Sequence, residues 1–99
     1  MEEMLIYTKL FDCYGELLTE KENEVFKDYY FENLSMQEIA DNNKVSKSAI
    51  HKTLQTAIEK LDFYEKILKI NKKNEFLSNI LNEENIDEIK EKIKSIIEI

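Results

Sequence analysis

The near absence of glycine and proline is the feature that most restricts how this chain can fold. Gly15 is the only glycine among 99 residues, and there is no proline. Proteins built from strands use both residues at their many turns, whereas helices are interrupted by them. Charged residues make up 35% of the chain, as expected for helices that keep one face in water. We therefore expect an all-α protein.

The first helix is expected over about residues 3–14. Leu5, Ile6, Leu10 and Cys13, with the stem of Lys9, share one side at helical spacing, so that side is expected to face the core. Gly15 follows directly, and glycine readily adopts the left-handed conformation that ends many helices. The sequence therefore predicts that Gly15 terminates this helix.

Hydroxyl residues mark where three further helices begin. Thr19 and Glu22, and again Ser35 and Glu38, have the spacing of a capping box, in which two side chains bond backbone N–H groups of the first turn. Ser46 stands at the N-cap position of the segment with the longest apolar pattern in the chain. Helices are therefore expected to start after these three hydroxyl residues.

The segment after residue 46 carries apolar residues at steps of three and four over five turns, which predicts a long helix ending near residue 70. "NKKN" (71–74) is expected to interrupt it. Two shorter helices are expected over about 74–81 and 86–97, joined by "NEEN" (82–85). The long stripe consists of Ile50, Leu54, Ala57, Ile58, Leu61, Tyr64 and Leu68.

The centre of the chain has the outline of a helix-turn-helix. Ala40 is small enough for a second helix to cross closely, and two asparagines and a lysine at residues 42–44 form the expected turn. Lys44 stands nearest to the site where glycine is common, because that site needs a positive φ. Val45 is expected to be buried behind the turn. The expected domains are a helix-turn-helix domain (1–70) and a helical extension (71–99).

The outward side of the helix after the turn suits the major groove of DNA. Lysine donates to phosphate or guanine, glutamine pairs with adenine, and the helix N-terminus itself favours a phosphate. The chain has no arginine, the commonest reader of guanine, so we expect weak or modest specificity. The candidate DNA-binding residues are Lys44, Ser46, Lys47, Ser48, His51, Lys52 and Gln55.

The net charge of −7 works against binding a polyanion. Nine acids and three lysines lie in residues 1–32, and six acids and three lysines in residues 83–99. Residues 33–60 hold three acids and four lysines and are mildly basic. The central segment therefore favours DNA, and the acidic ends favour either an adaptor that binds protein or RNA, or a structural dimer with a vestigial motif.

Most of the chain resembles a known family, the YlxM family of small bacterial helix-turn-helix proteins. The resemblance extends from the "YTKLFDCYGELLT" segment near the N-terminus through residue 68. The matching elements are "LT-x-K", a "YY" pair, "S-x-x-EIA", "VS-x-x-A(I/V)" and "L-x-x-YE-x-K". They correspond to Thr19, Lys21, Tyr29, Tyr30, Ser35, Glu38, Ile39, Ala40, Val45, Ser46, Ala49, Ile50, Leu61, Tyr64, Glu65 and Lys66.

The resemblance implies a fold and a function. The family is similar to region four of sigma factors, so the resemblance implies a helix-turn-helix of that type with a long recognition helix and additional C-terminal helices. It also implies DNA binding and a regulatory or accessory role in the signal-recognition-particle pathway, because the family's genes lie beside that of the particle's GTPase. The alternative is an adaptor of the particle's protein or RNA with no physiological DNA binding.

Catalysis and metal binding are not expected. The chain has one histidine, His51, and one cysteine, Cys13, whereas a zinc site needs three or four ligands. We expect no enzyme and no cofactor, and Cys13 is interpreted as a small core residue. The aromatic run at residues 29–31 could stack on single-stranded bases, but its helical spacing favours packing in the core.

The sequence also predicts where the protein is found and how it assembles. A lone cysteine, an acidic N-terminus and the lack of a long apolar run predict a cytoplasmic protein with no membrane anchor. The isoleucine face of residues 86–97 must dock somewhere, since an isolated helix of this length is marginal in water. A homodimer would cover that face, and folding back onto Tyr64, Leu68 and Phe76 of the same chain is the alternative.

Overall fold

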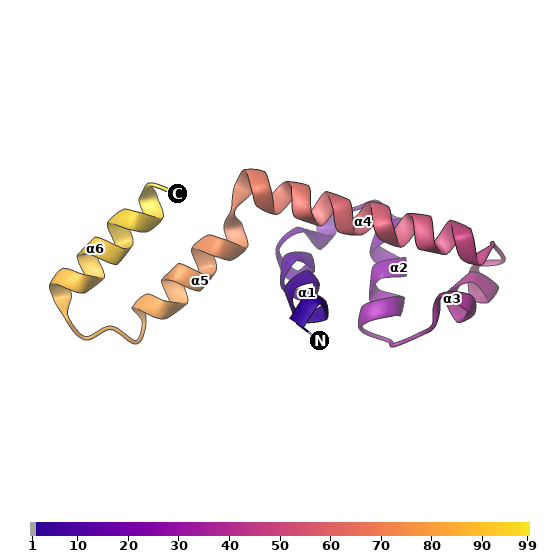
Figure 1. Ribbon diagram of the computed structural model, residues 1–99, viewed down its shortest axis with the longest axis horizontal. Helices are drawn as coiled ribbons and strands as arrows, with labels where there is room; N and C mark the ends of the chain where they lie inside the picture. The colour runs from indigo at the N-terminus through magenta and orange to yellow at the C-terminus, as the bar shows by residue number, and fades with distance from the viewer. Residues whose placement is uncertain (1) are drawn as a thin grey trace. The chain divides into compact units, whose positions relative to one another are not determined.

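The computed structural model describes residues 2–99, and its regular structure in that range is entirely helical (Figure 1). The expectation of an all-α protein is therefore confirmed. The elements are α1 (Glu2–Tyr14), the short 3-10 helix η1 (Gly15–Leu17), α2 (Glu20–Tyr30), α3 (Met36–Asn43), α4 (Lys47–Leu68), α5 (Ile70–Ile80) and α6 (Ile86–Ile97).

The chain forms two compact units, Met1–Tyr64 and Glu65–Ile99, called here the N-terminal and C-terminal units. The boundary between them falls inside α4, whereas the sequence places a domain boundary after residue 70. Leu61 is the last residue of α4 that is buried, and Phe63 and Ile67 beyond it are exposed. The part of α4 that belongs to the N-terminal unit therefore ends where its buried stripe ends.

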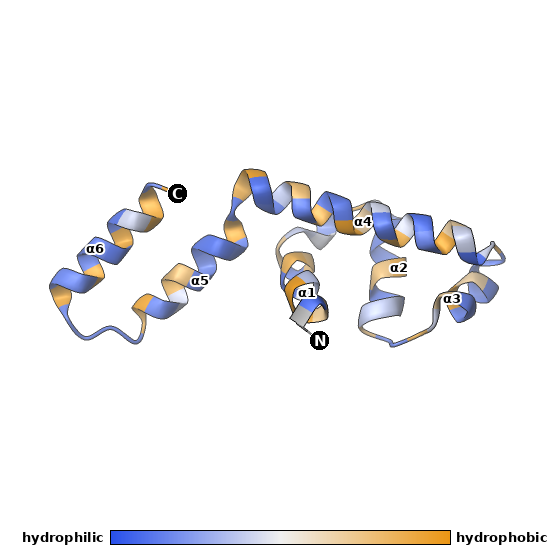
Figure 2. Cartoon of the chain, in the orientation of Figure 1, coloured by the Kyte–Doolittle hydropathy of each residue, from blue (hydrophilic) through white to orange (hydrophobic). Residues whose placement is uncertain are grey.

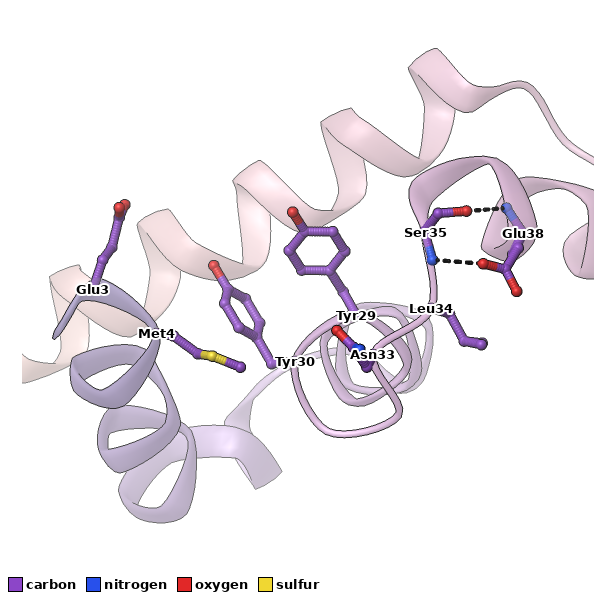
Figure 3. A pocket seen from close by; sticks show the side chains of 8 residues that line it. All are labelled: Glu3, Met4, Tyr29, Tyr30, Asn33, Leu34, Ser35 and Glu38. Atoms are coloured by element: carbon purple, nitrogen blue, oxygen red, sulfur yellow. Dashed lines mark hydrogen bonds between the residues drawn. The ribbon is translucent and has the colours of Figure 1, made fainter. Parts of the chain in front are cut away.

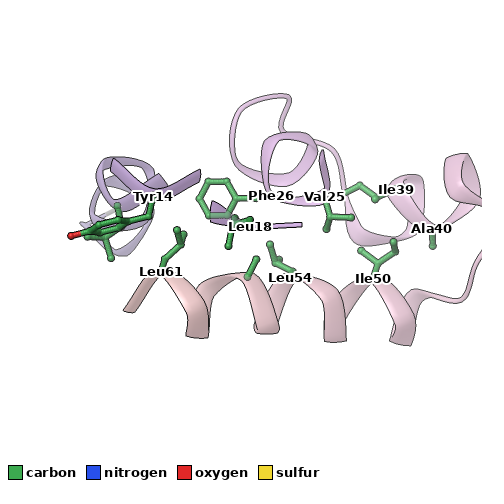
Figure 4. Close-up of a cluster of buried hydrophobic side chains, with 11 residues drawn as sticks. Tyr14, Leu18, Val25, Phe26, Ile39, Ala40, Ile50, Leu54 and Leu61 are labelled. Carbon is green, nitrogen blue, oxygen red and sulfur yellow. The ribbon is translucent and has the colours of Figure 1, made fainter. Parts of the chain in front are cut away.

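The hydrophobic core lies in the N-terminal unit, between α4 and the first three helices (Figure 4). Four residues of α4 point into it at steps of three and four, as the apolar stripe predicts. Leu68, the last residue of the predicted stripe, is exposed. The buried apolar residues are Leu10, Tyr14, Leu18, Val25, Phe26, Ile39, Ala40, Ile50, Leu54, Ala57 and Leu61.

The predicted helix caps are all present. The backbone N–H of Thr19 donates to Glu22 Oε1 at 2.9 Å, and that of Glu22 donates to Thr19 Oγ1 at 3.2 Å. Ser35 and Glu38 form the same reciprocal pair at the start of α3, with distances of 3.2 and 3.1 Å. Ser46 Oγ accepts from the N–H of Ala49 at 3.1 Å and caps α4. These caps satisfy donors that a helix start leaves unpaired.

The predicted buried side of α1 is correct at Leu10 and Cys13 and wrong at Leu5 and Ile6. Leu5 and Ile6 are 57% and 54% exposed, and the helix packs instead through an aromatic side that includes Phe11. The ring of Phe11 stacks on that of Phe26 at a centroid distance of 4.5 Å. Because α1 is apolar on more than one side, the larger buried area of the aromatic rings determines which side faces inward. The other residues of that side are Tyr7, Leu10 and Tyr14.

Gly15 ends α1 for a different reason from the one predicted. Gly15 does not have a positive φ, and it begins η1 instead of adopting the left-handed conformation. A Cβ atom on Gly15 would lie 2.9 Å from two ring carbons of Phe11. The residue is therefore needed for the close approach of its backbone to that ring.

The C-terminal unit consists of the end of α4, α5 and α6. The expected interruption at "NKKN" is wrong, because α5 begins at Ile70 and includes those residues. The break is at Lys69, which has a φ of 55°, and the carboxylate of Glu65 then accepts from the N–H groups of Asn71 and Lys72 at 3.1 Å each. No glycine or proline is present here, so a single left-handed residue and a borrowed cap separate the two helices.

Helix α6 has the predicted bounds, and residues 82–85 form the predicted joint before it. Asn85 Oδ1 caps it by accepting from the N–H of Glu88 at 3.1 Å. Among residues 65–99 no side chain is fully buried, and apolar and charged residues alternate along both helices (Figure 2). The large apolar side chains exposed on this unit are Ile67, Leu68, Ile70, Phe76, Leu77, Leu81, Ile86, Ile93 and Ile97.

Candidate nucleic-acid interface

A tight turn joins α3 to α4. Asn42 and Asn43 belong to α3, and only Lys44 adopts the left-handed conformation, with φ 56° and ψ 42°. The N–H of Val45 donates to the carbonyl of Ala40 at 3.0 Å and closes the turn. Of the three residues expected in the turn, Lys44 alone makes it, at the place where glycine is common in such motifs.

The end of α3 is fixed by burial and by hydrogen bonds within α3 and to α2. Ile39 and Ala40 are completely buried, as the motif requires for a close crossing. Asn43 Nδ2 donates to the carbonyl of Ile39 at 2.7 Å, and Lys21 Nζ donates to Asn43 Oδ1. Val45 is 42% exposed, so the prediction that it is buried behind the turn is wrong. The burial of Ile39 and Ala40 alone is sufficient to cover the inside of the turn.

All seven candidate DNA-binding residues are exposed, and the structure divides them into groups. Lys47, Ser48 and His51 line one shallow hollow together with Met36 of α3. His51 and Gln55 line a second hollow whose other wall is the tyrosine pair of α2. His51 therefore stands between the two. The remaining three candidates, Lys44, Ser46 and Lys52, line neither hollow.

The charge of this surface differs from that of the rest of the chain. Residues 42–58 contain no acid, although Asp41 and Glu59 stand directly on either side. Among the described residues, no carboxylate forms an ion pair with Lys44, Lys47 or Lys52. These ammonium groups are consequently available to a phosphate. Glu59 shares the second hollow with Gln55, so the favourable surface ends about three turns into α4.

The start of α4 adds a partial positive charge at the same place. Ser46 Oγ satisfies the N–H of Ala49, and the N–H groups of Lys47 and Ser48 at the first turn have no partner further back in the helix. Unpaired N–H groups and the helix dipole attract anions. The first turn of α4 thus presents backbone donors at the start of the helix that carries Lys47 and Lys52.

Sequence reasoning missed a further hollow, which lies beside the tyrosine pair and is lined by residues of α1, the end of α2 and the start of α3 (Figure 3). Tyr29 and Tyr30 are half-buried and pack against the core, as predicted, and each also forms a wall of this hollow. Phe31 is half-exposed but keeps an edge-on contact with Phe11. The "YY" pair was the available signal, but three separate elements contribute to the site.

In the part of the chain that the structure describes, no group of three or more histidine, cysteine, aspartate or glutamate side chains could hold a metal ion. In the same range, none of the helices has both the length and the apolar character needed to cross a membrane. Cys13 is half-buried beside the core, which agrees with its interpretation as a small packing residue.

Comparison with known proteins gives one consistent result. Residues 1–99 match the model of the family UPF0122, described as "Putative helix-turn-helix protein, YlxM / p13 like". A UPF0122 protein of Mycoplasma capricolum subsp. capricolum is 37% identical over 101 residues, which cover 100% of this chain and 89% of the relative. One from Clostridium perfringens is 36% identical over 110 residues and covers 98% of each chain. One from a Thermoanaerobacter species is 35% identical over 97 residues, which cover 98% of this chain and 79% of the relative.

Proposed function

Because this chain belongs to the UPF0122 family of YlxM/p13-like helix-turn-helix proteins, as its motifs predict, we propose that it binds DNA through the turn after α3 and the first turns of α4. The observation that carries this proposal is the acid-free surface of residues 42–58 in a chain of net charge −7. The three lysines on that surface are exposed and form no ion pair among the described residues.

Each candidate residue has a role that follows from its chemistry. Lys47 and Lys52 neutralise phosphates, and Lys44 does so from the turn. Ser46 and Ser48 place hydroxyls and the first N–H groups of α4 near the backbone of the duplex. His51 and Gln55 lie further along the helix, where Gln55 reads adenine in the major groove. Without arginine, the interface has modest specificity, and phosphate contacts supply most of the affinity.

The proposal extends to the cellular role that the YlxM resemblance implies. The protein acts as a regulatory or accessory factor of the signal-recognition-particle pathway, through a motif of the sigma region-four type. The alternative is an adaptor that binds the particle's protein or RNA without physiological DNA binding. Acids concentrated at both ends of the chain favour that alternative, and it would need a protein contact or an RNA loop because the RNA major groove does not admit a helix.

The proposed DNA-binding form is a homodimer. Ile86, Ile93 and Ile97 of α6 are exposed, and a two-fold interface would remove them from water. Such symmetry also allows two recognition helices to reach successive turns of the major groove, about 34 Å apart. A dimer would therefore double the number of phosphate contacts, which partly compensates for the low charge of each interface.

The test is a salt titration of binding to duplex DNA. Lys47→Ala and Lys52→Ala should each weaken binding about equally on different DNA sequences and lower the slope of log affinity against log salt by about one. Lys27→Ala, which removes the same charge from an exposed site on α2, is the matched control and should leave the slope unchanged. The melting temperatures of all three variants should match that of the parent.

Two results would reject the proposal. If the Lys47→Ala/Lys52→Ala double variant binds DNA as tightly as the parent, α4 does not enter the groove. If the parent binds the particle's RNA or protein tightly and DNA only at low salt, the adaptor role replaces DNA binding. The same titration with the particle's components therefore distinguishes the two functions.

A further inference from the structure

The hollow in Figure 3 has about 660 Å³ of space between the start of α1, the end of α2 and the start of α3. Two of its walls are aromatic. The rings of Tyr29 and Tyr30 meet nearly at a right angle, 86°, with centroids 5.1 Å apart. Two rings at this angle form a corner that presents aromatic surface from two directions. The lining is completed by Glu3, Met4, Asn33, Leu34, Ser35 and Glu38.

The charge in this hollow has one sign. Its lining contains two carboxylates, those of Glu3 and Glu38, and no lysine or histidine. Burial raises the pKa of Tyr30, and the neighbouring Tyr29 and the negative charge of Glu3 raise it further. Glu3 of α1 and Glu38 of α3 thus bring two negative charges to the hollow that the tyrosine pair lines. One oxygen of Glu38 caps α3 through the N–H of Ser35, and a carboxylate has further lone pairs for another donor.

We propose that this acidic aromatic hollow binds a positively charged side chain, foremost arginine, from a segment of a partner protein. A cation is attracted to the face of an aromatic ring within about 6 Å of its centre. The planar guanidinium of arginine both stacks on such faces and donates two parallel hydrogen bonds to a carboxylate. The chain itself has no arginine, so the ligand must come from another molecule.

The neighbouring surface favours a peptide over a small ammonium ion. Tyr29 and Tyr30 also line the adjacent hollow of about 420 Å³, which contains the apolar side chains of Met36, Leu54 and Ile58. A peptide with an arginine next to a large apolar residue would therefore fill both sides of the tyrosine pair. The acid of Glu59 at that second hollow adds to the preference for a basic segment over a phosphate backbone.

The proposed arginine site is separate from the proposed DNA-binding residues, although His51 and Gln55 line the second hollow. None of the seven proposed DNA-binding residues lines the 660 Å³ hollow. Variants that remove the lysines of α4 should consequently leave peptide binding intact. Variants of the hollow should leave the salt slope for DNA unchanged.

The experiment measures binding of the full-length chain to a capped decapeptide with alternating arginine and leucine. The control peptide has citrulline at each arginine, which keeps the shape and removes the charge. Calorimetry should give at least tenfold weaker binding of the citrulline peptide, and two-dimensional NMR should place the shifted signals at the tyrosine pair. Raising the salt concentration should weaken the arginine peptide selectively.

The matched variant is Glu3→Gln/Glu38→Gln, which removes both charges. Glutamine at residue 38 still accepts the capping hydrogen bond, so the start of α3 should stay folded. We expect this variant to bind the arginine peptide about tenfold more weakly. Glu20→Gln/Glu24→Gln, at two exposed acids of α2 outside the hollow, makes the same change in net charge and should stay within about twofold of the parent.

Tyr29→Leu keeps an apolar side chain and removes one face of the corner, and it should weaken binding about fivefold. Equal binding of the arginine and citrulline peptides, or unchanged binding by Glu3→Gln/Glu38→Gln, would overturn the proposal. A second result would also overturn the proposal. In that case the folded parent binds neither peptide but binds a single-stranded oligonucleotide, and Glu3→Gln/Glu38→Gln binds the oligonucleotide more tightly. The tyrosine pair would then be assigned to base stacking.

Discussion

The two units of this chain are built from similar local signals but are very different inside. Both have polar caps and apolar residues at helical spacing, and both form well-defined helices. The N-terminal unit buries eleven apolar side chains, whereas none of the side chains of residues 65–99 is fully buried. Local signals are therefore enough to form helices, but a core requires several apolar faces that meet.

The same contrast is visible in two ion pairs of nearly equal length. Lys60 Nζ lies 2.8 Å from Glu22 Oε1 in the N-terminal unit, and Lys92 Nζ lies 2.9 Å from Glu83 Oε2 in the C-terminal unit. Glu22 is buried and also accepts from the N–H of Thr19, while the side chain of Glu83 is 25% exposed. Distance alone does not indicate which pair contributes more to stability, because water screens the more exposed pair more strongly.

The largest expected effect is on assembly, where the apolar face of α6 is tested directly. The full chain should sediment as a dimer at micromolar concentration, and a chain truncated after Asn82 should sediment as a monomer. A full chain that remains monomeric would refute the dimer. A truncated chain that still dimerises would move the interface to α4.

The second expected effect compares one isoleucine from each unit. Ile50→Ala opens a cavity in the core and should reduce the free energy of unfolding by roughly 2–5 kcal/mol. Ile93→Ala, at a site that is 43% exposed in the single chain, should cost less than about 1 kcal/mol in the monomeric state. Urea melts at low protein concentration measure both. A silent Ile50→Ala would contradict the assigned inward face of α4.

The third expected effect separates the two ion pairs. Burial raises the pKa of Glu22, but hydrogen bonds from Lys60 and Thr19 outweigh it, and the pKa ends below its usual value of 4.5. A carboxyl whose pKa is lower in the folded state adds stability above pH 4.5, and this stability is lost as the pH falls through the lowered value. Glu22→Gln should lower the free energy of unfolding by about 1–3 kcal/mol at pH 7. Between pH 7 and acid, the free energy of unfolding of this variant should fall less steeply than that of the parent.

Glu83→Gln is the matched control for that prediction, because its carboxylate also pairs with a lysine. Hydrogen bonds from Lys92 and from the N–H of Asn85 lower the pKa of Glu83, but its side chain is more exposed than that of Glu22. At each pH between 3 and 7, the urea midpoint of the N-terminal unit in Glu83→Gln should equal that of the parent at the same pH. An equal loss in the two variants would show that burial does not distinguish the pairs.

The smallest expected effect concerns helix caps. Ser35→Ala removes the acceptor for the N–H of Glu38 and should lower the global stability by about 1 kcal/mol. Asn85→Ala removes the corresponding acceptor for the N–H of Glu88. It should reduce the helical content of residues 86–97 without moving the main urea transition. Circular dichroism combined with hydrogen exchange would distinguish a global loss from a local one.

Sequence reasoning was most successful where the physical cause is local. Capping boxes and the bounds of α6 depend on residues within one turn, and the structure contains them as predicted. It failed at Leu5 and Ile6 because α1 offers more than one apolar side, and tertiary packing chose between them. It failed at residues 71–74 because polar residues without glycine or proline do not interrupt a helix.

The candidate site shows the same limit. The exposure of the seven residues on α4 and its turn follows from helical periodicity, so a single segment was enough to predict it. The hollow beside Tyr29 and Tyr30 combines side chains from α1, α2 and α3. Periodicity along one helix contains no information about which neighbours complete such a hollow, so that site became visible only with the fold.

At Lys44, the stability of the turn and the proposed binding of DNA place opposite demands on one residue. A non-glycine residue in this conformation costs roughly 1–2 kcal/mol, and glycine would remove that strain. Glycine would also remove one of the three positive charges that flank the start of α4. No substitution at this position can improve both properties at once, because the strain comes from the side chain that carries the charge. In the proposed DNA-binding role, the turn is therefore a compromise between a more stable motif and a more strongly binding one.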